Sequence, residues 1–110
     1  LTEGLEFFDK NFGFAGLTGA SQSHSSLYVT RDGGTTFTEL QLPLETVTEL
    51  PPLAKELNFT IENYKYCEMP KKKEDILTIK LLTGAGEIQG IRFESKDNGE
   101  TWAYAGISVE

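Results

Sequence analysis

The octapeptide Ser95-Lys96-Asp97-Asn98-Gly99-Glu100-Thr101-Trp102 reads S-x-D-x-G-x-T-W, and this spacing predicts a tight hairpin turn. Gly99 can adopt the positive φ that such a turn requires. The carboxylate of Asp97 can accept hydrogen bonds from the backbone N–H groups of the turn, and the Ser95 hydroxyl can add another. Trp102 follows the aspartate by five positions, so we expect it to fold back and pack as a large apolar anchor.

A second copy of the pattern lies earlier in the chain, with Thr in place of Ser and Phe in place of Trp. It reads Thr30-Arg31-Asp32-Gly33-Gly34-Thr35-Thr36-Phe37, and Asp32 and Asp97 are 65 positions apart. The same reasoning gives structural roles to Thr30, Asp32, Gly34 and Phe37. The two stretches are called the first octapeptide (residues 30–37) and the second octapeptide (residues 95–102) below.

The rest of the chain alternates short β-type runs with turn residues, which predicts an all-β fold of eight strands in two antiparallel sets of four. Each octapeptide joins the third and fourth strands of its set. The 110 residues fit one domain, divided into a first blade-like unit at 4–42, a crossover at 43–57 and a second unit at 58–109. The expected strands are Leu5–Phe8, Phe12–Thr18, Leu27–Arg31 and Thr36–Leu42, then Phe59–Cys67, Asp75–Leu82, Ile88–Glu94 and Thr101–Val109.

The crossover contains Pro51 and Pro52, which break any strand. The stretch Pro52–Leu57 predicts one or two helical turns, since proline is favoured at the first helical position. Apolar residues along the crossover are expected to order it by packing against the sheets. They are Leu44, Val47, Leu50, Leu53 and Leu57.

Two four-stranded units cannot close a propeller, which takes at least about four blades. A small two-sheet sandwich is the favoured arrangement; a ring formed by several chains and a piece of a longer propeller remain as alternatives. The strand Asp75–Leu82 is apolar on both faces. We therefore expect the first sheet to cover one face of the second sheet, and the crossover or another chain to cover the other face.

The octapeptides resemble Asp-box repeats, also called BNR repeats, which occur in sialidases, sortilin-type receptors and photosystem II assembly factors. The stretch Phe12–Gly16 is similar to the strand that precedes the box in the assembly factors. The resemblance implies propeller-blade sheets in which the boxes are structural and remote from any active site. Sialidases bind their substrate carboxylate with three arginines, and this chain has only Arg31 and Arg92, so a self-contained sialidase is excluded. Arg31 is expected to face solvent.

The net charge of the chain limits the classes of partner that it can bind. The formal net charge is −7, and an acidic balance argues against nucleic acid and anionic membranes, which both need a positive footprint. The basic run Lys71–Lys73 is followed by Glu74 and Asp75, which predicts a solvated hairpin tip. No apolar run reaches the length of a membrane span. The chain begins at Leu1 without a signal peptide; we expect a trimmed or processed product from an extracellular or cell-surface protein.

Few residues indicate catalysis, metal binding or ligand binding. Cys67 is the only cysteine and His24 the only histidine, the latter in the polar loop Ser21–Ser26; we expect a buried thiol and no catalytic pair. No calcium-loop or phosphate-loop pattern is complete, so neither a metal nor a cofactor is predicted. Tyr64 and Tyr66 share a face of one expected strand. They form a possible ligand platform for sugar or peptide, although packing against the crossover is the favoured interpretation.

These observations predict a non-catalytic binding or assembly module that recognises a protein or a glycan and possibly forms a homo-oligomer. The alternative is a fragment or subunit of a glycan-processing enzyme whose catalytic residues lie elsewhere. A purely structural accessory domain is a third class.

Overall fold

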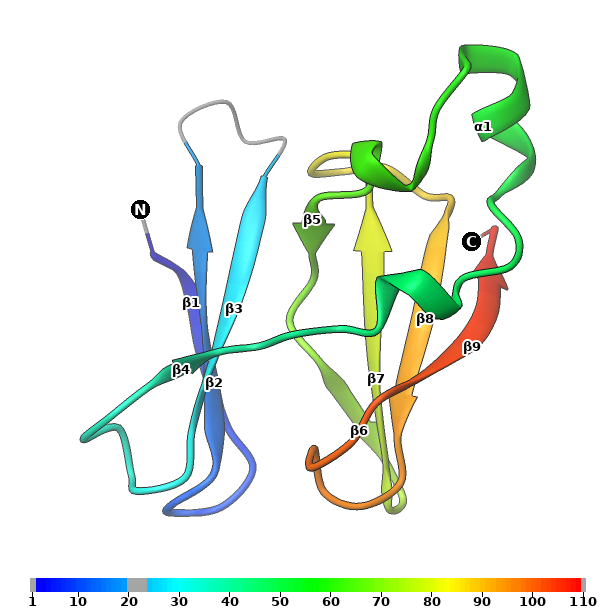
Figure 1. Ribbon diagram of the computed structural model, residues 1–110. Helices are drawn as coiled ribbons and strands as arrows, with labels where there is room; N and C mark the ends of the chain where they lie inside the picture. Colours follow the sequence, from blue (N-terminus) through cyan, green and yellow to red (C-terminus); the bar gives the residue numbers. More distant parts are fainter. Residues whose placement is uncertain (1, 20–23, 110) are drawn as a thin grey trace.

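The computed structural model describes residues 2–19 and 24–109 and confirms the all-β architecture, with two blade-like units lying side by side (Figure 1). The strands of the first unit are β1 (Thr2–Phe7), β2 (Gly13–Thr18), β3 (Ser25–Thr30) and β4 (Thr38–Glu39). The strands of the second unit are β5 (Tyr66–Cys67), β6 (Lys71–Lys73), β7 (Ile76–Leu82), β8 (Gly90–Ser95) and β9 (Ala103–Ser108). All pairings within each unit are antiparallel.

One short parallel contact joins the units into a single open sheet. Ser25 at the start of β3 pairs with Tyr66 in β5, and the strand order is β1-β2-β3-β5-β7-β8-β9. The side chain of Ser25 also donates to the Cys67 carbonyl at 3.0 Å, and its backbone N–H donates to the Lys65 carbonyl at 3.1 Å. Ser25 is buried, so these bonds satisfy polar groups that would otherwise lose water.

The expected strand Phe59–Cys67 is wrong as far as Lys65, and only Tyr66 and Cys67 at its end form a strand, β5. The first part of the expected strand folds into a 3₁₀ turn, η2 (Ile61–Asn63), because Thr60 and Asn63 form a capping box. The strand position is taken by β5 and β6, which both pair with β7. The lysines of β6 therefore lie within a strand and not at a hairpin tip.

The crossover follows its prediction more closely. It contains η1 (Leu44–Thr46) and the helix α1 (Pro52–Leu57), which has proline at its first position and ends at Asn58 in the left-handed region. The fourth strand of the first unit is shorter than predicted, because only Thr38 and Glu39 pair with β3 and the chain then leaves the sheet. Leu44 and Leu57 are exposed and do not hold the crossover in place.

The crossover and the first unit cover the same face of the second unit, which corrects the expectation that they lie on opposite faces. Alternation and register place Leu77, Ile79, Leu81 and their partners on β8 on this face, called the inner face. Leu81, Ile91 and Phe93 pack against crossover residues, whereas Leu77 packs against the first unit.

The opposite face of the second unit carries a patch of exposed and half-buried polar side chains, whereas Tyr66 and Leu82, which register places on the same face beside β3, are buried. Register places the members of this patch in two rows across β6 to β9, and the patch is called the outer polar face. Its residues are Lys71, Thr78, Lys80, Arg92, Glu94 and Ala103. A bulge at Gly106 (φ 104°) reverses the alternation in β9. Ile107 consequently lies opposite Ile91 on the inner face, and not with Ala103 as the sequence predicted.

Aromatic packing forms the junction between the units. Phe12 and Phe14 of the first unit form one buried cluster with Leu77, and Trp102 packs against it. The rings of Phe14 and Trp102 meet edge to face with centroids 6.4 Å apart, a favoured geometry for aromatic pairs. The second octapeptide therefore supplies a ring that holds the first unit.

Replacement of Phe14 by alanine should destabilise the whole domain. The Phe14 side chain is fully buried at the junction, and truncation of a buried phenylalanine costs about 3–5 kcal/mol. Leu17→Ala is the matched control on the same strand, because Leu17 is 42% exposed and a surface change shifts stability by about 0.5 kcal/mol or less. Urea unfolding measures both. Equal losses for the two variants would contradict the described junction.

Candidate functional site

The second octapeptide closes its turn through one carboxylate and one hydroxyl. Asp97 Oδ1 accepts from the Thr101 backbone N–H at 2.9 Å and from the Ser95 hydroxyl at 2.8 Å, while Oδ2 accepts from the Thr101 hydroxyl at 2.5 Å. The Ser95 hydroxyl in turn accepts from the Gly99 N–H at 2.7 Å. These bonds link the end of β8 to the residues that lead into β9.

The first octapeptide repeats the same set of bonds. Asp32 Oδ1 accepts from the Thr36 N–H and the Thr30 hydroxyl, both at 2.9 Å, and Oδ2 accepts from the Thr36 hydroxyl at 2.6 Å. The Thr30 hydroxyl accepts from the Gly34 N–H at 2.9 Å. Both octapeptides thus have the predicted backbone-clamping geometry.

Hydrogen bonding keeps both carboxylates ionised. The bonds from Thr36 lower the pKa of Asp32 to about 2, and those from Thr101 lower the pKa of Asp97 to about 2. A carboxyl group with so low a pKa carries no proton to donate near neutral pH. The geometry of both aspartates suits them to holding turns.

The two trailing rings differ in burial. Trp102 packs as an apolar anchor, as predicted, and its partner is Phe14. The expectation that Phe37 packs in the interior is wrong, because its side chain is 41% exposed. The reason lies in the order of the units: Trp102 rests on the unit that precedes its own. The described chain holds no unit before the first one, so Phe37 has no equivalent surface to pack on.

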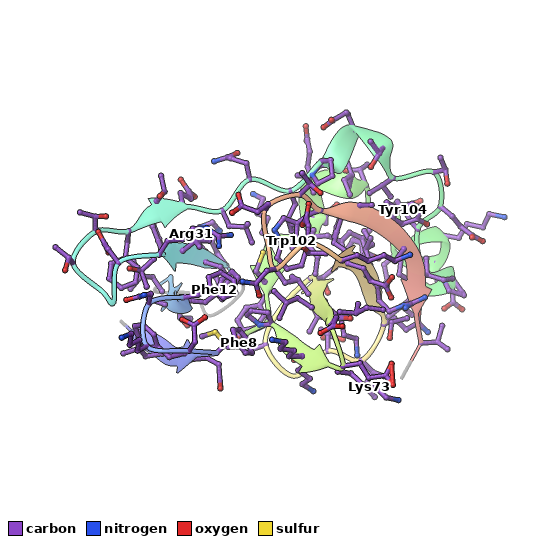
Figure 2. All side chains as sticks on the ribbon, turned by 90° about the horizontal axis from the view of Figure 1, so that it is seen from below. Phe8, Phe12, Arg31, Lys73, Trp102 and Tyr104 are labelled. Atoms are coloured by element: carbon purple, nitrogen blue, oxygen red, sulfur yellow. The ribbon has the colours of Figure 1, made fainter. Side chains whose placement is uncertain are left out.

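Arg31 connects the two turns and does not simply face solvent. Its guanidinium donates to the Asn98 carbonyl at 3.2 Å, lies 3.5 Å from a Glu100 carboxylate oxygen, and stacks over the Phe12 ring at 4.5 Å. Figure 2 shows Arg31 and Phe12 on the side of the first unit that faces Trp102. The stacking adds a cation–π attraction to the junction.

A hollow of about 470 Å³ lies between the two octapeptides. The first unit contributes Arg31, Thr38 and Leu40 to its lining, and the second contributes Gly99, Glu100 and Trp102. The indole N–H of Trp102 is buried without a hydrogen-bond partner in the part of the chain that the structure describes. The hollow is an open space that both units line at their junction.

The first unit also carries a broad apolar surface that the sequence reading did not single out. Register places Leu5 opposite Ala15 and Ala15 opposite Tyr28, with Phe7 and Leu17 on the same face. Leu5 is 61% exposed, Phe7 37% and Leu17 42%. The alternation Leu5-Glu6-Phe7 was the available signal. The surface formed by Leu5, Phe7, Ala15, Leu17 and Tyr28 is called the open apolar face.

Phe37 lies at the rim of the open apolar face. A Cβ placed on Gly34 would lie 3.7 Å from the tip of Phe7 and 4.0 Å from the tip of Phe37. The tips of both rings therefore lie near the glycine of the first octapeptide. Phe37 thus adds an exposed aromatic ring beside the apolar surface.

The structure places Tyr64 and Tyr66 in the interior. Their exposed fractions are 4% and 6%, and Tyr64 stacks edge to face on Phe59, just after the crossover, with centroids 6.3 Å apart. Tyr64 also lies outside the strands, so the two rings do not share a strand face. They are packed as core residues and offer no open aromatic platform.

The thiol and the imidazole do not form a catalytic arrangement. Burial raises the pKa of Cys67 to about 12, which keeps the thiol protonated and unreactive. His24 is exposed and lies 3.4 Å from the Ser26 hydroxyl, while Ser21–Ser23 of the predicted loop lie outside the described residues. Over residues 2–19 and 24–109, no group of three His, Cys, Asp or Glu side chains could hold a metal ion.

No helix in the described ranges is long and apolar enough to cross a membrane.

The low pKa values of Asp32 and Asp97 predict that the domain loses stability in a defined range of acidic pH. Their folded pKa of about 2 lies below the ordinary value of 3.8 for an aspartate, so their ionised forms stabilise the fold above about pH 4, and this contribution is lost as the pH falls toward about 2. Asp97→Asn should lower the thermal midpoint at neutral pH and reduce its change across that window. Asp75→Asn, which removes an exposed carboxylate outside both octapeptides, is the control. Equal thermal midpoints and pH profiles for the two variants would contradict the clamping role.

Comparison of the chain with protein-family models, with curated proteins and with solved structures finds no match.

Proposed function

We propose that this chain is a non-catalytic binding or assembly module of the Asp-box type, and that it recognises a protein through the open apolar face. The observation that carries the proposal is the concentration of exposed apolar side chains on one side of the first unit. Isolated exposed hydrophobic residues are common on soluble proteins, whereas contiguous patches mark interaction sites. Leu5, Phe7 and Leu17 lie on one sheet face, and Phe37 lies at its rim.

The second unit supports this interpretation, because its corresponding face is covered. The pair Gly13–Thr30 in the first unit corresponds to the pair Leu77–Ser95 in the second, since Thr30 and Ser95 begin the two octapeptides. By this register Leu17 corresponds to Leu81, which is only 3% exposed beneath the crossover. The open apolar face is thus the counterpart of a surface that already packs against other elements.

The chemistry of the face favours a protein over a glycan. Sugar recognition needs exposed rings combined with several convergent polar groups, and the two tyrosines proposed for that role are buried. A sheet face of alternating aliphatic and aromatic side chains matches the faces that pack against one another in β-sandwiches, about 10 Å apart.

A charge placed on the open apolar face should abolish partner binding. Leu5→Lys puts an ammonium group among apolar side chains, while Ile88→Lys changes an equally exposed aliphatic residue in the second unit, 60% against 61% exposed. We expect the wild-type chain and Ile88→Lys, immobilised as bait, to retain the same protein from the native extract and Leu5→Lys to lose it.

Two outcomes would count against this function. Equal retention by both variants would remove the open apolar face as the binding surface. Binding to a glycan array, or turnover of fluorogenic glycosides by this chain alone, would favour the glycan-recognising or glycan-processing alternatives instead.

A further inference from the structure

We infer that the open apolar face binds a second copy of this chain, and that the second copy presents its outer polar face with the adjoining hollow. The inference rests on the proposed assembly function and names its partner. It follows from a comparison of the junction inside the chain with the surfaces left uncovered at its two ends.

The junction inside the chain joins two different sides of a blade-like unit. The first unit contributes the side that carries Phe12, Phe14 and Arg31, and the second unit contributes its inner face with Trp102. Within residues 2–19 and 24–109, two sides lack such a partner: the open apolar face of the first unit, which corresponds to the inner face of the second, and the outer polar face of the second unit. Each chain therefore presents both surfaces that a contact of the junction type would need, one on each unit.

The outer polar face continues into a hollow that repeats the hollow at the junction. This second hollow has a volume of about 410 Å³, and each of its six lining residues lies 65 positions after a residue that lines the first. Lys96, Thr101, Ala103 and Ala105 stand where Arg31, Thr36, Thr38 and Leu40 stand in the first unit.

The group that would enter the second hollow is present and exposed on every chain. At the junction, Gly99, Glu100 and Trp102 of the second octapeptide form the wall of the first hollow that faces the first unit. Their counterparts 65 positions earlier are Gly34, Thr35 and Phe37. Phe37 is 41% exposed at the rim of the open apolar face, so a neighbouring chain can receive its ring.

The side chains of the second hollow suit this occupant. Ala103 and Ala105 replace the larger Thr38 and Leu40, which leaves room for an aromatic ring. Lys96 takes the position of Arg31, whose guanidinium donates to the carbonyl of Asn98. The counterpart of Asn98 in the first octapeptide is Gly33, so the Lys96 ammonium is placed to meet the Gly33 carbonyl of the next chain.

The charges of the outer polar face make this contact weaker than the junction inside the chain. Glu94 and Thr78 stand where Val29 and Phe14 stand in the first unit by register. Glu94 is already paired with Arg92 at 3.5 Å, and Arg92 donates to the Ala105 carbonyl at 2.7 Å. These polar groups retain partners on association, but they bury less apolar area. Association is therefore reversible and depends on concentration.

The contact is heterologous, because two different surfaces meet. Such contacts close into rings or continue as filaments. Propellers contain about four to eight blades, so a closed ring of two-unit chains would hold about two to four copies.

Solution mass tests the contact directly. The weight-average mass of the full chain should rise with concentration from one chain toward about two to four chains, the range set by propeller closure. Phe37→Lys removes the inserted ring and places a second ammonium against Lys96, while Ala103→Tyr fills the receiving hollow. Each variant should remain monomeric alone, and Ile88→Lys should assemble as the wild type does.

The solution mass of a mixture of the two variants distinguishes the proposed contact from other modes of association. Phe37→Lys keeps its receiving hollow and Ala103→Tyr keeps its ring, so the mixture should form a one-to-one dimer and nothing larger. This dimer also shows that both variants are folded. Assembly by Ala103→Tyr alone would overturn the proposal, because it would mean that two open apolar faces pack on each other.

A wild-type chain that stays monomeric at every concentration would also overturn the proposal. In that case, Leu5-dependent retention of a different protein from the extract would leave the proposed function standing with another partner. If the chain neither self-associates nor retains another protein through Leu5, both the proposed function and this inference are wrong.

Discussion

The fold depends on two ionised carboxylates that each hold a hairpin in one conformation. Asp32 and Asp97 accept hydrogen bonds from backbone and hydroxyl groups on the far side of their turns. Because these bonds join the last residue of one strand to the approach of the next, they set where the following aromatic ring emerges. For the second octapeptide that ring is Trp102, which reaches Phe14 across the junction. The geometry of this turn thus acts together with the pairing of Ser25 and Tyr66 to orient the two units.

The repeat of this arrangement explains the distribution of exposed surface. A unit that packs by placing its ring on the preceding unit leaves two unlike surfaces free when only two units are present. One of these is apolar in this chain, with Leu5, Phe7 and Leu17 exposed. The other is polar, with Glu94 paired to Arg92. Such a pair of surfaces suits a component that is completed by another sheet, and it accounts for exposed aromatic residues on an acidic domain.

Much of the architecture could be predicted from local patterns. The turn chemistry of both octapeptides, the helix that begins at Pro52 and the strands on either side of residues 97–99 depend on contacts a few positions apart. The first part of the strand predicted at Phe59–Cys67 failed because a capping box of Thr60 and Asn63 competed with its β-type composition, and only Tyr66 and Cys67 form a strand. The role of Arg31 was missed for a different reason, since its partners Asn98 and Glu100 lie in the other octapeptide.

The amino-acid sequence alone determined the class of the fold, the two clamped turns and the residues that build them, because hydrogen bonds within eight residues do not depend on the rest of the chain. Only the tertiary structure decided which rings are buried. Phe37 and Trp102 occupy the same position in the same motif, yet Trp102 packs on Phe14 whereas Phe37 is 41% exposed. The burial of a side chain is a property of the neighbour that covers it, and that neighbour is set by the order in which whole units pack.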